Sequence, residues 1–165
     1  MNKKYRQYCG LLAAVVAYYV IHEGAHLVYA LCCGVFKNIN VIGLGIQIDV
    51  YREQMTDTQL GIFCLVGAVA TFLTGWGLIF ATRWICRQSS KVFRAVCYYV
   101  TLAMLLADPV YLGILAPFVG GGDLNGIALL LPRGLAQGFF IALLLFNGWT
   151  IWKLVLPPYS KSFQE

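Results

Sequence analysis

Four long apolar stretches constrain the fold of this chain more than any other feature of its sequence. Each has the roughly 20 apolar residues that a helix needs to cross the hydrocarbon core of a bilayer. Apolar residues make up 60% of the 165-residue chain and charged residues only 12%, whereas about a quarter of a soluble domain is charged. We therefore expect a single all-α membrane domain over residues 1–165. Its four transmembrane helices cover approximately residues 9–33, 60–84, 95–118 and 135–156.

Prolines and glycines interrupt the third apolar stretch and the residues after it. Pro109 and Pro117 fall inside the stretch, and Gly120-Gly121-Gly122 follows it. Proline removes a backbone hydrogen bond from a helix, and glycine adopts backbone angles that other residues avoid. The sequence thus predicts a third span that breaks here, with a helical continuation from Leu124 to Leu131.

Lysine and arginine side chains predict how the spans are oriented. They cluster before the first span, between the second and third, and at the end of the fourth: Lys3, Lys4 and Arg6; Arg83, Arg87, Lys91 and Arg94; Lys153 and Lys161. These clusters share one side of the bilayer if the spans alternate, and cationic loops favour the cytoplasm. Both termini are therefore expected to be cytoplasmic. The net charge of +5 is then a topology signal, and no folded basic face indicates a nucleic-acid partner.

The segment between the first two spans alternates between apolar and other residues. From Ile42 to Val50 the even positions are Ile, Leu, Ile, Ile and Val, and the odd ones include Gly43, Gln47 and Asp49. A period of two predicts a β-strand, so we expect a short β-hairpin or strand here. It could pack on the membrane surface, or it could hold an unwound substrate by strand addition at an exposed edge.

An HExxH motif formed by His22, Glu23 and His26 lies inside the first span. Residues four apart share a helix face, so both imidazoles can bind one zinc ion. Glu23 follows the first ligand, where its carboxylate can take a proton from a zinc-bound water. The chain has only these two histidines, and ionisable side chains in a bilayer are functional candidates by default. The motif predicts one zinc ion per chain and Glu23 as the catalytic base.

A third protein ligand is expected, because a catalytic zinc ion usually has three together with a water. Asp108 and Asp123 are the acids deep in the apolar remainder. Asp108 would lie level with His22 in a straight third helix, although it precedes Pro109, which disfavours helical geometry. An unwound stretch at the glycines would instead bring Asp123 to the depth of the zinc ion. The residues leave open whether Asp108 or Asp123 is the third ligand. The acid that does not bind the ion would orient a ligand or a water.

Taken together, these residues resemble the site-2 protease clan of intramembrane zinc metalloproteases. The likeness rests on His22-Glu23-Gly24-Ala25-His26, on the small residues Gly67-Ala68-Val69-Ala70, which are similar to the clan's GPxAN-like segment, and on Gly122-Asp123-Leu124-Asn125-Gly126. In the clan, the Asp of an NxxPxxxLDG pattern is the third zinc ligand, and this favours Asp123 over Asp108. Here no Asn-x-x-Pro precedes Asp123 at the usual spacing, and Gly122 replaces the Leu. One branch of the clan has a Gly-Ser-Asp-Ala version of this motif, and the segment around Asp123 is more similar to that version.

The resemblance implies a zinc-dependent endopeptidase in a bacterial cell membrane, a minimal member of the clan without appended domains. Its substrates would be transmembrane or membrane-anchored proteins, and it would act within the lipid bilayer. Asn125 could contact the substrate backbone or oxyanion, or it could cap the helix that restarts nearby. The main alternative is a zinc-binding membrane scaffold or regulatory subunit without catalysis. Substitution of Glu23 distinguishes the two, because loss of function with zinc retained indicates an enzyme.

Overall fold

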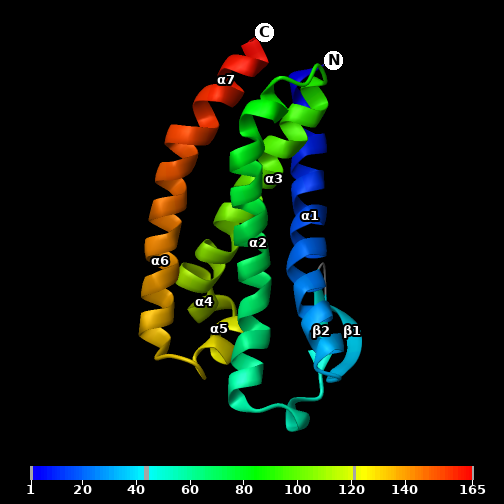
Figure 1. Cartoon of the computed structure of the whole chain (residues 1–165), viewed down its shortest axis with the longest axis vertical. Coiled ribbons are helices and arrows are strands. Elements are labelled where there is room, and N and C mark those ends of the chain that lie inside the picture. Colours follow the sequence, from blue (N-terminus) through cyan, green and yellow to red (C-terminus); the bar gives the residue numbers. More distant parts are fainter. Residues whose placement is uncertain (1, 43–44, 121, 165) are drawn as a thin grey trace.

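The computed structural model describes residues 2–42, 45–120 and 122–164, which form a mostly helical bundle (Figure 1). Its main elements are α1 (Lys3–Cys32), β1 (Phe36–Ile42), β2 (Gly45–Val50), α2 (Asp57–Cys86), α3 (Lys91–Val110), α4 (Ala116–Val119), α5 (Gly122–Ile127), α6 (Arg133–Thr150) and α7 (Leu156–Gln164). A 3-10 turn, Arg52–Gln54, precedes α2. The π-helical segments Tyr111–Leu115 and Ile151–Val155 join α3 to α4 and α6 to α7.

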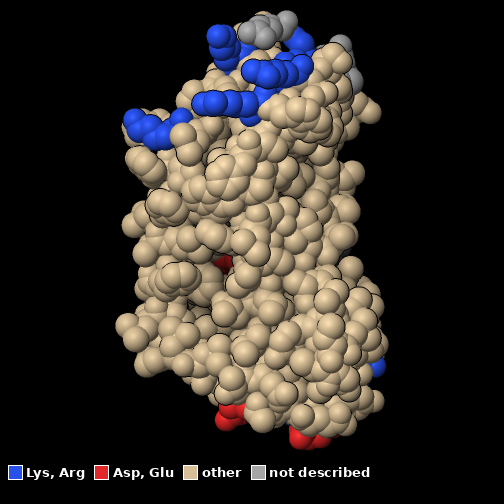
Figure 2. All heavy atoms as spheres, viewed as in Figure 1, with Lys and Arg blue, Asp and Glu red and all other residues tan. Residues whose placement is uncertain are grey.

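Among the described residues, four helical segments are long and apolar enough to cross a membrane, as the sequence predicted. They are Lys3–Cys32, Asp57–Cys86, Lys91–Val119 and Arg133–Gln164. The N- and C-terminal ends of the chain lie at the same end of the bundle (Figure 1). Most of the visible Lys and Arg side chains gather at that end (Figure 2). These features indicate a multi-pass membrane protein, and the cytoplasmic location of this end stays a prediction.

Side-chain caps explain where the first three long helices begin. The Asn2 side chain accepts a hydrogen bond from the backbone of α1, and the Ser90 hydroxyl does the same for α3. Thr56 and Gln59 form a reciprocal capping box at the start of α2. Each cap satisfies backbone N–H groups that have no partner within the helix. Beyond the end of α1, Gly34 has a φ of 69°, a value that favours glycine.

A two-strand antiparallel hairpin connects α1 to α2. Of the two predicted forms, a hairpin or a single strand, the structure has the hairpin. Ile42 pairs with Gly45, so the predicted alternation crosses a chain reversal instead of following one strand, and the first strand begins earlier, at Phe36. Gly43 and Leu44 lie outside the described residues. The hairpin packs Ile48 inward, at 5% exposed, and leaves Val41 75% exposed.

The third span continues as a helix through Pro109, so the expectation that this proline takes Asp108 out of helical geometry was wrong. A proline lacks the N–H that would bond to the carbonyl four residues earlier, here that of Leu105. The side-chain amide of Asn147, on α6, donates to this carbonyl at 2.7 Å and replaces the missing bond. Membrane helices tolerate proline where a neighbouring helix satisfies the freed group in this way. Asp108 therefore keeps a helical backbone.

The helix breaks at Gly120, whose φ of 84° is accessible mainly to glycine. The next helix, α5, begins before the predicted restart at Leu124 and ends before Leu131, with hydrogen-bonded turns after it. Gly121 lies outside the described residues. As a consequence, Asp123 lies in the first turn of a helix and not in an unwound loop.

Two apolar clusters hold the bundle together on either side of the buried polar residues. One joins the hairpin, α2, α5 and α6 around Phe63 and Leu124, and the other joins α2, α3 and α7 around Ile79 and Leu105. Along α2, Thr71 lies between these clusters and is 1% exposed. The polar residues of the middle layer are therefore enclosed by apolar packing above and below.

Candidate metal centre

His22 and His26 lie one helical turn apart on the buried face of α1. Their exposed fractions are 5% and 3%, and their Nε2 atoms face each other at 3.1 Å. The ring of Phe63, on α2, packs against His26 with the ring centroids 4.8 Å apart. Two imidazole nitrogens thus converge on one point inside the bundle, as the HExxH spacing predicts for a single helix face.

Asp123 brings a carboxylate to the same point from the first turn of α5. Its Oδ2 lies 3.3 Å from Nε2 of His22 and 3.9 Å from Nε2 of His26. The three ligand atoms are all within 4.8 Å of one another, so this group could hold a metal ion. The Asp123 side chain is 23% exposed, which leaves one side of the group open.

The separations of the three donor atoms fit a zinc ion. Tetrahedral ligands about 2.1 Å from zinc lie roughly 3.4 Å from one another. The observed separations of 3.1, 3.3 and 3.9 Å lie around this value. Two imidazoles and one carboxylate also leave a fourth position for water, as in catalytic zinc sites. His22, His26 and Asp123 are therefore the residues that would hold the ion.

Gly67 allows α2 to approach the two histidines. A Cβ atom built at this position would lie 2.6 Å from Nε2 of His26 and 2.7 Å from Nε2 of His22. Real Cβ atoms do not approach other atoms so closely, so any larger residue would push the imidazoles away. Gly67, the first residue of the small-residue run, is therefore glycine for a steric reason that lies in the site itself.

Asp108, on α3, lies at the other ring nitrogen of His22. Its Oδ1 is 3.1 Å from Nδ1 of His22, which is within ion-pair distance, although the two groups are not aligned as a hydrogen bond. The Tyr18 hydroxyl donates to Oδ1 at 2.6 Å, and the Thr71 hydroxyl donates to Oδ2 at 2.5 Å. These two bonds hold a carboxylate that is 1% exposed. The structure thus places Asp123 beside both Nε2 atoms and Asp108 behind His22.

A cavity of about 580 Å³ opens beside the three ligand atoms. Glu23 lines it together with His22, His26 and Asp123, so the whole HExxH motif faces one space. The hairpin contributes Gly45–Ile48 of β2 to the same lining. A carboxylate, a candidate metal group and a stretch of backbone in β conformation therefore share one solvent-accessible volume.

Asn125 does not join this group. It is exposed on α5 and does not line the cavity. It also lies within α5, which begins at Gly122, so it does not cap the start of that helix.

The sequence reasoning missed Tyr18, Thr71 and Phe63. Tyr18 precedes His22 by one helical turn and Thr71 follows Gly67 by one turn, so the helical period could have placed both on the site-facing sides of their helices. No pattern in the sequence singles out Phe63.

No family model, curated protein or solved structure matches this chain. The class of this protein is therefore inferred from its fold and from the group formed by His22, His26 and Asp123. In the part of the chain that the structure describes, four helices long and apolar enough to cross a membrane, one hairpin and a His-His-Asp group that could hold a metal ion indicate a multi-pass membrane protein.

Proposed function

We propose that this protein is an intramembrane zinc metalloprotease of the site-2 protease type. The observation that carries the proposal is the convergence of His22, His26 and Asp123 beside a cavity that Glu23 also lines. At 1.5 Å per residue, His22 lies about 15 Å along α1 from the end of that helix at Cys32. The two histidines thus lie within a helix long enough to span the membrane, where a protease would meet membrane-embedded peptide bonds.

The residues divide the chemistry between them. A zinc ion bound by the three ligands would activate a water and polarise the carbonyl of the scissile bond. Glu23 accepts the proton of the attacking water and passes it to the leaving amine. Its place next to His22 in the sequence keeps its carboxylate on the cavity without making it a ligand. The Asp108 carboxylate, 3.1 Å from Nδ1 of His22, would favour the ring orientation that directs Nε2 to the other two ligand atoms.

Strand β2 supports a peptide as the substrate. A substrate helix hides its carbonyl groups in its own hydrogen bonds, so the segment to be cut must become extended. In the sheet that the described residues form, β2 pairs only with β1, which leaves its other edge for a further strand. Because Gly45–Ile48 line the cavity, a peptide added there would run past Glu23.

The test compares Glu23→Gln with Glu53→Gln, an identical substitution at an exposed acid after the hairpin. Each purified variant is reconstituted into vesicles with membrane proteins of the expression host, and new N-termini are identified by mass spectrometry. We expect new termini within transmembrane segments for the wild type and Glu53→Gln. Glu23→Gln should produce none while retaining its zinc, because an amide cannot accept the proton. A Glu23→Gln variant that cleaves normally would contradict the proposal, and a zinc-loaded wild type without cleavage would favour the scaffold.

A further inference from the structure

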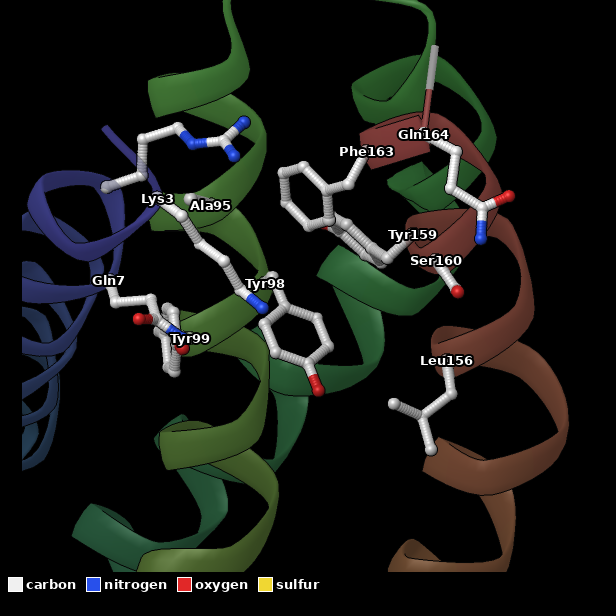
Figure 3. Close-up of a pocket in the computed structure, with 11 residues that line it drawn as sticks. Lys3, Gln7, Ala95, Tyr98, Tyr99, Leu156, Tyr159, Ser160, Phe163 and Gln164 are labelled. Atoms are coloured by element: carbon white, nitrogen blue, oxygen red, sulfur yellow. The ribbon is translucent and has the colours of Figure 1, made fainter. Parts of the chain in front are cut away.

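A second cavity, of about 450 Å³, lies at the end of the bundle that holds both termini and shares no lining residue with the cavity beside the candidate metal group. It is a groove with α3 as its floor and with α1 and α7 as its walls (Figure 3). Its polar lining includes Lys3, Arg6 and Gln7 on α1 and Ser160 on α7, and its aromatic lining includes Tyr98 and Phe163. Nothing in the proposed proteolysis uses this groove.

The groove is cationic. Lys3 and Arg6 line it, and no Asp or Glu is among the described residues of its lining. The guanidinium of Arg6 lies 5.6 Å from the centre of the Phe163 ring, and that of Arg94 lies 5.9 Å from the same centre. Two guanidinium groups therefore flank the Phe163 ring, which lines the groove, although Arg94 itself is not part of the lining. The last residue, Glu165, lies outside the described residues.

Arg94 gives an independent reason to expect an anion nearby. It is only 5% exposed, its Nε has no hydrogen-bond partner, and its Nη1 donates to the Cys86 carbonyl at 3.4 Å. Across the described part of the chain, the only ion pair that a Lys or Arg forms is that of Arg52 with Asp57, beside the hairpin. Burying a charge without a partner is strongly unfavourable. An anion in the adjacent groove would lower this cost through its electrostatic attraction, without direct contact, because Arg94 does not line the groove.

The position of the groove selects a lipid as the source of that anion. The surrounding end of the molecule carries the gathered Lys and Arg side chains (Figure 2), so it lies at the height of the headgroups of one leaflet. Tyr98 and Leu156 form the side of the groove that faces the bilayer interior (Figure 3). A phospholipid can place its phosphate at the cationic part of the groove and its acyl chains along the side formed by Tyr98 and Leu156. A free phosphate could bind only at the cationic part. Basic pockets between transmembrane helices bind anionic lipid headgroups for these reasons.

We propose that this groove binds the headgroup of an anionic phospholipid. The phosphate contacts Lys3 and Arg6, and the headgroup hydroxyls lie within reach of Gln7 and Ser160. The acyl chains leave past Leu156 toward the bilayer. The lipid thereby ties α1 to α7, the two helices that form the walls of the groove.

The experiment measures lipid binding by native mass spectrometry of the delipidated protein, titrated with phosphatidylglycerol or phosphatidylcholine. We expect one phosphatidylglycerol to bind with clear preference over phosphatidylcholine. The double variant Lys3→Gln/Arg6→Gln should weaken this binding by about tenfold or more, since each cation near a membrane surface contributes on the order of a few-fold. The matched control, Lys4→Gln/Arg87→Gln, removes the same charge from exposed residues outside the groove and should change it less than about twofold.

Four results would overturn the proposal. Equal losses in the two double variants would mean diffuse attraction by the basic end and no groove site. Equal binding of phosphatidylcholine, or no lipid retained by the wild type, would mean no selection for an anionic headgroup. Displacement of phosphatidylglycerol by millimolar inorganic phosphate would mean a site for small anions instead of lipids. Size-exclusion profiles and unfolding temperatures that match the wild type confirm that the variants are folded.

Discussion

The carboxylate of Asp108 lies 3.1 Å from Nδ1 of His22, while that of Asp123 lies 3.3 Å from Nε2 of the same ring. A metal-binding histidine commonly directs its second nitrogen to a carboxylate, which fixes the tautomer and the ring orientation. Asp108 is itself held by the hydroxyls of Tyr18 and Thr71. The two acids therefore have different positions: Asp123 lies where it could bind an ion together with the two histidines, and we propose that Asp108 orients His22.

Replacement of the two acids should separate these roles. Asp123→Ala removes a bond to the ion and should lower zinc affinity far more than Asp108→Ala. Loss of an orienting partner typically costs about 10–100-fold. The measurement is a competition titration of each purified variant against a chelator of known affinity. If Asp108→Ala empties the site while Asp123→Ala leaves it full, Asp108 is the ligand and the assignment reverses.

Gly67→Ala should weaken metal binding by about tenfold or more without unfolding the protein. The added methyl group would lie 2.6 Å from Nε2 of His26, so the imidazole must move out of position. The control is Gly77→Ala on the same helix, where an added Cβ would meet no heavy atom within 4 Å. Both variants gain the same helix propensity, so a difference in zinc affinity reports the contact. Equal affinities would show that α2 does not restrict the histidines.

Asn147→Leu should destabilise the bundle by about 1–3 kcal/mol, because it leaves the Leu105 carbonyl buried without a donor. The partner variant is Pro109→Ala, which restores a backbone N–H for that carbonyl. In the Pro109→Ala background, Asn147→Leu should therefore lower the free energy of unfolding by much less. Free energies of unfolding in detergent complete this double-mutant cycle. Equal costs in the two backgrounds would show that Asn147 does not compensate for the proline.

Reporter fusions after Gln88 and after Glu53 test the four-span layout. The first position lies between α2 and α3 and the second between the hairpin and α2, so the fusions should report opposite sides of the membrane. The Gln88 fusion should be cytoplasmic, because the Lys and Arg clusters share its side. Two fusions on the same side would rule out this layout.

Much of the fold, and the two histidines of the candidate site, can be predicted from local patterns in the sequence. Hydropathy gives the four spans, and a spacing of four residues puts His22 and His26 on one helix face. The helical geometry at Pro109 and the choice between Asp108 and Asp123 do not follow from the residues, because both depend on side chains that come from other helices. Pro109 stays helical because Asn147, distant in the sequence, reaches the Leu105 carbonyl. A reading of local propensity alone therefore predicts a break where the tertiary structure has none.

The metal content of the purified protein tests the central claim most directly. Wild-type protein, His22→Ala and His26→Ala are purified in parallel, and zinc is quantified per chain by mass spectrometry. The account predicts about one zinc ion per wild-type chain and almost none in either variant, since two ligands cannot hold a structural or catalytic zinc ion firmly. Full zinc occupancy in both histidine variants, or a wild type that stays without zinc when it is supplied, would contradict it.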